Sequence, residues 1–113
     1  MAYERLVRKL TVENLWLYIL SLLKEAPRYG YEIREQLAKR FGFKPNEVTV
    51  YAVLFRLKRG GYIALQEVKE SKEGPKRKYY ALTPKGEEAL GKARRFLEES
   101  YERLFGAIQT PGP

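Results

Sequence analysis

The chain of 113 residues contains no cysteine and no histidine. Without cysteine, disulfide bonds, thiolate metal sites and thiol nucleophiles are excluded. Without histidine, imidazole catalysis and imidazole metal ligands are excluded as well. Two close carboxylate pairs occur, Glu87-Glu88 and Glu98-Glu99, but adjacent residues of a helix point about 100° apart and do not form a catalytic dyad. We therefore expect neither an enzyme nor a bound cofactor.

Long hydrophobic runs and a glycine-rich nucleotide-binding motif are also missing. The longest apolar run, Leu15–Leu20 with Leu22 and Leu23, is far shorter than the roughly 20 residues of a membrane span. The first residues, Met1 to Arg5, are charged and lack the apolar stretch of a signal peptide. We expect a cytoplasmic protein with no membrane partner, in agreement with its lack of cysteine.

Positive charge is abundant and concentrated. The chain has 22 Lys and Arg against 14 Asp and Glu, a formal net charge of +8. The segment Lys44–Lys78 holds nine Lys and Arg against four Glu, whereas the part from Pro84 onward has five of each sign. Such concentration in one segment is typical of a surface that binds a polyanion.

Apolar spacing and breaker residues predict helices in the first half of the chain. A helix over Val12–Ala26, capped by Thr11, has almost no polar face and must be covered on more than one side. Tyr29-Gly30-Tyr31 predicts a turn in which Gly30 takes a backbone angle that other residues avoid. An amphipathic helix follows over Glu32–Phe41 and ends at Gly42.

The second half predicts a helix, a hairpin and a long helix. Asn46 is a good N-cap for a helix over Asn46–Arg59, whose inward stripe is Val50, Leu54 and Leu57. Two strands are expected at Ile63–Lys69 and Lys76–Leu82, around a turn rich in glycine, proline and charge. Thr83 and Pro84 begin the last helix, which is expected to run to about Ile108.

This order of elements defines the expected fold: mainly α with a small β-hairpin, a winged helix-turn-helix plus a long C-terminal helix. We expect a DNA-binding domain over 1–83, a dimerisation helix over 84–108 and a disordered tail over 109–113. The helix over Asn46–Arg59 would be the recognition helix.

The last helix is expected to join two copies of the chain. A helix of about 25 residues spans roughly 37 Å, longer than a three-helix core can cover. Pairing in a homodimer therefore accounts for its apolar stripe better than packing on its own domain does. Trp16 and Tyr18 could line an effector pocket, but packing in the core or interface is the favoured alternative. The expected interface residues are Leu90, Ala93, Phe96, Leu97, Tyr101, Leu104, Phe105 and Trp16.

Three segments together resemble the PadR-type transcriptional regulators. The first is Tyr29–Ile33. The second is Thr49-Val50-Tyr51 with Leu54, Arg56-Leu57, Gly61 and Ile63, and the third is Gly74–Tyr80 with Leu82-Thr83 and Gly86. The resemblance covers roughly Leu15–Leu90. Departures from the family pattern are Ala52 in place of a proline, Lys58 in place of an acidic residue, and Tyr62 in place of a leucine.

The resemblance implies a homodimeric repressor of the short subfamily, whose members pair through their terminal helices. Some of those members bind flat aromatic drugs at the dimer interface, which leaves open a small aromatic effector here. The last helix contains no tryptophan, so their drug-stacking site is not carried over.

The candidate DNA contacts lie on the recognition helix and on the hairpin. Thr49, Tyr51, Ala52, Phe55 and Arg56 fall off the inward stripe of the helix. We expect Thr49, Tyr51 and Arg56 to face the DNA rather than the core, with Ala52 beside them; for Phe55 both alternatives stay open. The cations Lys76, Arg77 and Lys78 are expected to bind phosphate rather than to form an ordinary solvated strand end.

The sequence thus predicts a regulator that binds double-stranded DNA sequence-specifically, at an inverted-repeat operator, as a homodimer. Two alternatives remain. The same fold could be a protein-interaction module whose charge serves solubility, or the basic face could bind RNA.

Overall fold

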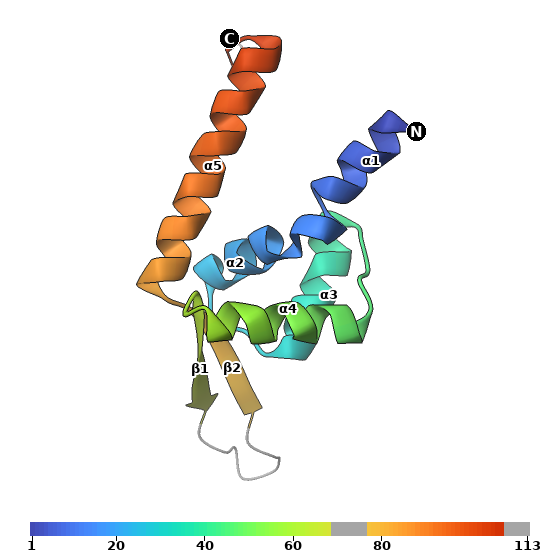
Figure 1. The fold of residues 1–113 in the computed structure, drawn as a ribbon. Helices are drawn as coiled ribbons and strands as arrows, with labels where there is room; N and C mark the ends of the chain where they lie inside the picture. Colours follow the sequence, from blue (N-terminus) through green and yellow to red (C-terminus); the bar gives the residue numbers. More distant parts are fainter. Residues whose placement is uncertain (69–76, 108–113) are drawn as a thin grey trace, which may run out of the picture.

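The computed structural model describes residues 1–68 and 77–107. Four helices precede a two-stranded hairpin, and a long helix follows it (Figure 1). This arrangement is a winged helix fold and confirms the fold class expected from the sequence. In chain order the elements are α1 (Ala2–Lys9), the 3-10 turn η1 (Val12–Asn14), α2 (Leu15–Glu25), α3 (Gly30–Phe41), α4 (Glu47–Arg59), β1 (Ile63–Val68), β2 (Arg77–Leu82) and α5 (Pro84–Phe105).

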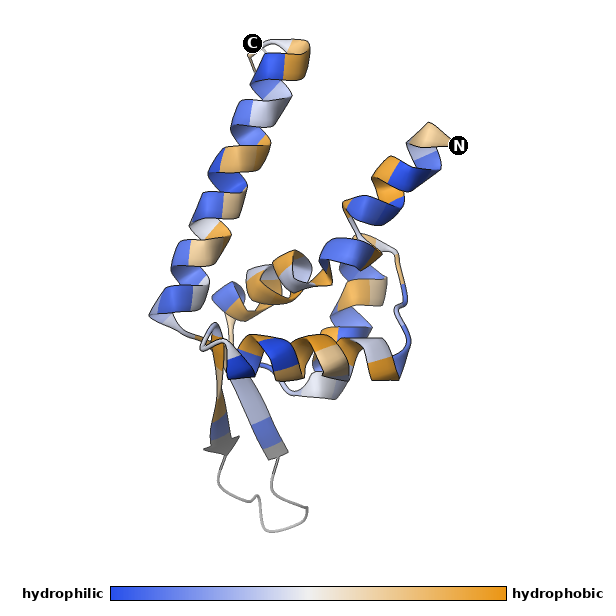
Figure 2. Cartoon of the chain, in the orientation of Figure 1, coloured by the Kyte–Doolittle hydropathy of each residue, from blue (hydrophilic) through white to orange (hydrophobic). Residues whose placement is uncertain are grey.

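Helix α2 lies at the centre of the fold. It carries many apolar residues (Figure 2) and packs against α3, α4, β2 and α5. Its buried residues are Leu15, Ile19, Leu20, Leu22 and Leu23, as expected for a helix covered on several sides. It has only 11 residues, and in the described part of the chain no helix is both long and apolar enough to cross a bilayer.

The expected helix over Val12–Ala26 is wrong at its beginning. Residues Val12–Asn14 form the 3-10 turn η1, and the α-helix starts only at Leu15. Thr11 does not cap it; its hydroxyl instead donates to the carbonyl of Val7 at 2.6 Å. The side chains around η1 are thus engaged with the helix that precedes it.

That preceding helix, α1, was not expected from the sequence. Its residues bury nothing in the described chain, and its apolar side chains are exposed. They are Tyr3, Leu6, Val7 and, directly after the helix, Leu10, a spacing that places them on one face. Two ion pairs with η1 hold α1 in place: Arg8 and Lys9 pair with Glu13 at 3.1 and 2.9 Å. Both cations lower the pKa of Glu13, and the hydrogen bond from Lys9 has the larger effect.

Caps predicted for the later helices are confirmed. Asn46 Oδ1 accepts a hydrogen bond from the Thr49 amide at 2.8 Å, and Thr83 Oγ1 accepts one from the Gly86 amide at 3.1 Å. Gly42 follows α3 with a φ of 74°, which favours glycine. Each cap satisfies backbone groups that a helix end leaves without a partner.

The turn expected at Tyr29-Gly30-Tyr31 is wrong, because these residues begin helix α3. Gly30 is the first residue of α3, Tyr29 is its N-cap, and Gly30 has no positive φ. The reason for glycine is steric instead. A Cβ at Gly30 would lie 2.4 Å from the hydroxyl oxygen of Tyr51, which is on α4.

The hairpin is antiparallel, with Ile63 opposite Leu82 and Val68 opposite Arg77. Lys69, Lys76 and the expected turn between them lie outside the described residues. Strand β2 also pairs on its other side: Arg28 and Tyr80 exchange two backbone hydrogen bonds, at 2.8 and 3.0 Å. The hairpin is therefore fixed to the segment that enters α3.

The first turn of α5 is fixed to the end of α4. The Thr83 hydroxyl donates to the Gly61 carbonyl and the Lys85 ammonium donates to the Gly60 carbonyl, each at 2.6 Å. Gly86 lies against the Tyr62 backbone, so close that a Cβ would come within 2.1 Å of the Tyr62 oxygen. From this anchored start α5 extends away from the other helices (Figure 1).

We predict that Gly86→Ala lowers the free energy of unfolding by roughly 1–3 kcal/mol, because the new methyl group meets backbone that cannot move aside. Gly91→Ala on the same helix is the matched control. Its Cβ would meet nothing nearer than an Arg95 nitrogen at 3.7 Å, so the better helix former should stabilise by about 0.5–1 kcal/mol. Urea unfolding measures both, and equal effects of the two changes would contradict the contact.

Candidate nucleic-acid interface

Three kinds of surface surround helix α4. Its inward stripe is confirmed, since Val50, Leu54 and Leu57 are buried in the core. The opposite face is open to solvent and is apolar over most of its length. There Val48 is 79% exposed and Phe55 is 64% exposed, with half-buried Ala52 between them. Phe55 therefore does not belong to the core, which excludes one of the two alternatives for this residue.

Tyr51 lies on the flank of α4 that faces α3 and the hairpin. Its ring packs over Gly30, and 41% of its surface stays exposed. Tyr80 of β2 lies close to Tyr51. The pKa of Tyr80 is raised mainly by burial and, to a smaller extent, by the neighbouring Tyr51. Tyr51 is thus held between α3 and the hairpin, with part of its ring left accessible.

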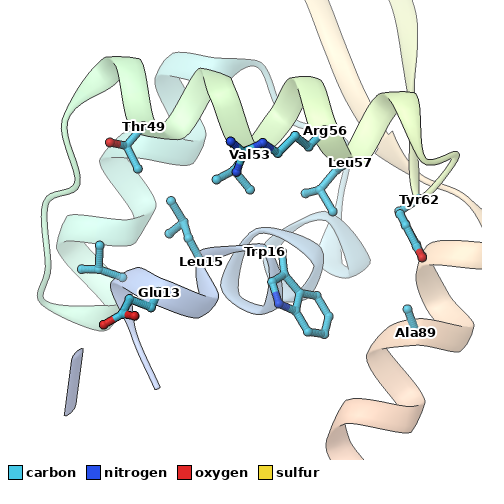
Figure 3. Close-up of a pocket in the computed structure, with 10 residues that line it drawn as sticks. Glu13, Leu15, Trp16, Thr49, Val53, Arg56, Leu57, Tyr62 and Ala89 are labelled. Carbon is cyan, nitrogen blue, oxygen red and sulfur yellow. The ribbon is translucent and has the colours of Figure 1, made fainter. Parts of the chain in front are cut away.

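Thr49 and Arg56 lie on the other flank of α4. They line a pocket of about 640 Å³ between α4 and the segment formed by η1 and α2 (Figure 3). The tryptophan Trp16 lies at the opposite wall, and Glu13 contributes from η1. The remaining lining is mostly apolar: Val12, Leu15, Val53, Leu57, Tyr62 and Ala89. Thr49 and Arg56 accordingly lie at one edge of the outer face of α4, the exposed face that carries Val48 and Phe55. Tyr51 lies at the other edge of this face.

Cations gather where α4 ends and the hairpin begins. Arg56, Lys58 and Arg59 are exposed in the last turn of α4, and Lys78 is exposed on β2. Arg77 is the first residue of β2, and Lys76 lies outside the described residues. Because β1 follows α4 after a short turn, the hairpin extends from the same end of the helix (Figure 1).

These cations differ from those on α5 in their partners. Among the described side chains no ion pair involves Arg56, Lys58 or Arg59, and Lys78 lies opposite Glu67 in the hairpin. On α5, by contrast, the cations pair with glutamates of the same helix: Lys92 with Glu88, Arg94 with Glu98 and Arg103 with Glu99. Within the described side chains, the charge of Arg56, Lys58 and Arg59 is thus not neutralised by a neighbouring carboxylate, and it is available to an external anion.

A cluster of tyrosines, which sequence reasoning missed, joins the hairpin to the start of α3. The rings of Tyr29 and Tyr31 stack at 6.2 Å, and the ring of Tyr79 meets Tyr29 edge-on at 5.6 Å. Tyr31 keeps 60% of its surface exposed on the same side. The only signal for this cluster in the sequence is the pair of tyrosines on either side of Gly30. The third member, Tyr79, comes from a strand 48 residues after Tyr31.

The residues expected at a dimer interface occupy different positions along α5. Leu90 packs partly against the core, and Ala93 is half-buried. From Phe96 onward the apolar side chains are exposed, including Leu97, Tyr101, Leu104 and Phe105. Trp16 is half-buried at the pocket beside α4 rather than on α5. The far half of α5 is therefore an apolar arm without a partner in the described chain.

Comparison with known proteins identifies the family. Residues 19–92 match the family described as "Transcriptional regulator PadR-like family". The chain belongs to this family. The expected resemblance is thereby confirmed, and the matched segment contains α3, α4, the hairpin and the anchored start of α5.

Individual relatives agree with this assignment. The chain is 32% identical to the transcriptional regulator Rv3488 of Mycobacterium tuberculosis over 97 residues. This alignment covers 85% of this chain and 88% of that protein. It is 42% identical over 77 residues to a Lysinibacillus sphaericus protein described as uncharacterized, covering 66% of this chain and 65% of that protein. The chain thus spans about two thirds of the length of the latter relative.

Solved structures show the same fold. A PadR-like transcription factor from Bacteroides fragilis superposes with a TM-score of 0.73 at 34% identity, over 88% of this chain and 95% of that one. Such a score over most of both chains shows that the two proteins share this fold.

Proposed function

We propose that this PadR-family protein is a DNA-binding transcriptional regulator that binds an inverted-repeat operator as a homodimer and represses the adjoining gene. The observation that carries the proposal is the set of exposed cations, Arg56, Lys58, Arg59 and Lys78, at the end of helix α4 and on the hairpin beside it. A helix of this diameter fits the major groove, and the hairpin cations then reach the flanking phosphates.

Individual roles follow from the three faces of α4. The outer face enters the groove, with Ala52 small enough for close approach of the backbone. Tyr51 on one flank and Thr49 with Arg56 on the other then lie near the walls of the groove, where phosphate oxygens are their nearest acceptors. On the hairpin, Lys76, Arg77 and Lys78 bind the phosphates outside the groove.

The homodimer is supported by exposed apolar surface on two helices. The arm of α5 exposes Phe96, Leu104 and Phe105, with Phe105 at 74%, and α1 exposes Leu6 and Val7. Surface of this kind on a soluble chain is typical of a subunit interface. Two-fold pairing through α5 then presents two α4 helices to DNA, at half-sites about 10 bp apart or a multiple of it.

A small aromatic effector also remains a proposal. Some members of the short subfamily bind such a ligand at the dimer interface, and the residue expected there from α2 is Trp16. In this chain the indole of Trp16 borders the pocket beside α4 (Figure 3). A ligand that reached this pocket would contact Arg56 and Thr49, so it would act directly on the flank of the recognition helix.

The proposal predicts a preference for duplex DNA over both alternatives. In an electrophoretic shift assay at physiological salt, the chain should bind DNA from upstream of its own gene. Random duplex should compete about 10³-fold less well or worse, and RNA should compete no better than random duplex. Competition by RNA as strong as that by the upstream DNA would instead support an RNA-binding protein, and no shift at all would support a protein-interaction module.

Replacing Lys76, Arg77 and Lys78 together by alanine should weaken binding to all duplexes alike, because phosphate contacts carry no sequence information. The slope of log K against log salt should become shallower by up to about 3. A matched control removes three cations of α5 that pair with glutamates of the same helix, with Lys92, Arg94 and Arg103 changed to alanine, and should leave the slope unchanged. An unchanged slope in the hairpin variant would remove the hairpin from the mechanism.

Leu104→Glu on the arm of α5 should dissociate the homodimer, because it buries an unpaired charge in the proposed interface. Sedimentation equilibrium should show a dimer for the original chain and a monomer, at the same concentration, for the variant. The control is Arg103→Glu, which places the same residue at the neighbouring exposed position. If both variants sediment as the original chain does, the arm of α5 is not the interface.

A further inference from the structure

The outer face of α4 carries a stripe of apolar side chains that the fold itself does not use. Val48, Ala52 and Phe55 are spaced by four and three residues, so they lie within about 60° of one another around the helix at 100° per residue. Arg59 continues the same line after one more turn. Val48 and Phe55 are 79% and 64% exposed.

No part of the described chain covers this stripe. The core takes the opposite face of α4, through Val50, Leu54 and Leu57. Tyr51 and Gly30 occupy one flank, and the pocket with Trp16 occupies the other. Helix α1 and the arm of α5, which carry the other large exposed apolar surface, point away from α4 and the hairpin (Figure 1).

The charge around the stripe indicates what covers it. Arg56, Lys58 and Arg59 in the last turn of α4 and Lys78 on the hairpin lie at one end of it, and all four are exposed. A partner that fits must therefore be anionic at its edges and apolar at its centre. The major groove of DNA has this character at thymine, because phosphates line its walls and the C5-methyl group of thymine projects into it.

We propose that Val48, Ala52 and Phe55 recognise thymine methyl groups, and that each operator half-site contains thymines beneath this stripe. The inference rests on the proposed function and specifies its target. At 1.5 Å per residue the stripe from Val48 to Phe55 is about 10 Å long. It therefore follows about three base-pair steps of 3.4 Å, and the thymines lie within about four consecutive base pairs.

Each residue of the stripe has a separate part in this recognition. Val48 and Phe55 are the two large side chains, and they contact methyl groups at the two ends of the run. Ala52 lies between them, and its small side chain lets the helix approach the base edges closely. Arg59 follows Phe55 by one turn at the end of this stripe and is placed to bind a phosphate next to the last thymine.

The test begins with selection of bound fragments from random duplex DNA by the full chain. Synthetic duplexes of the selected operator are then made with single thymines replaced by uracil, which removes only the methyl group. Burying one methyl group is worth about a 4-fold change in affinity. We expect losses of this size at two or more thymines within four base pairs of each half-site, and losses below 1.5-fold at thymines elsewhere.

Variants assign the methyl groups to side chains. Val48→Ala and Phe55→Ala should each abolish the preference for thymine over uracil at one end of the run and leave it intact at the other. Phe55→Leu, which stays apolar, should retain part of it. Lys78→Ala should weaken the thymine and uracil duplexes equally. Thermal melts by circular dichroism verify that each variant is folded.

The possible failures are distinguishable. If no duplex is enriched over random DNA, the proposed function itself is wrong, and this inference falls with it. If an operator is selected but lacks thymines in such a run, or if uracil binds as well as thymine throughout, only the inference is overturned. Retention of the full thymine preference by both alanine variants would overturn the assignment to Val48 and Phe55.

Discussion

The burial of helix α2 is the constraint on which the rest of the structure depends. Eleven residues with almost no polar face cannot stay in water, so α3, α4, β2 and α5 are all brought to pack around them. Burying a leucine or isoleucine side chain stabilises a protein by about 1.5–3 kcal/mol. Five such residues, Leu15, Ile19, Leu20, Leu22 and Leu23, are buried in α2. The inward stripe of α4 is part of this core, which leaves the opposite face of α4 turned to solvent.

Two outward surfaces result, and they differ in charge. Among the described side chains, Arg56, Lys58 and Arg59 of α4 have no anionic partner, whereas three cations of α5 pair with glutamates four residues away along the same helix. The first surface retains a positive field, and the second is electrically balanced around an apolar stripe. These are the respective requirements of a phosphate-binding face and of an interface between subunits. The anchor at Gly86 ties α5 to the end of α4 and so couples the two surfaces.

Local signals in the sequence were sufficient for most of the fold. The caps Asn46 and Thr83 and the stop at Gly42 were predicted because such signals act within one turn of the residue that carries them. Helix α1 was missed, although Tyr3, Leu6, Val7 and Leu10 have helical spacing, because a short charged segment buries nothing. The role of Gly30 was misassigned because its reason is a contact with a residue 21 positions away. The neighbours of Thr49 and Tyr51 on the two flanks of α4 likewise could not be predicted, because they come from other elements and the spacing of residues along one helix does not reveal them.

The central claim is that α4 enters the major groove twice, once from each subunit of a dimer joined through α5. Interference by dimethyl sulfate tests it most directly, because this reagent methylates guanine N7 in the major groove and adenine N3 in the minor groove. On a selected operator, the account predicts two clusters of interfering guanines related by two-fold symmetry, with centres about 10 bp apart or a multiple of it. Interference confined to adenine N3, or a single cluster without a symmetric counterpart, would contradict it.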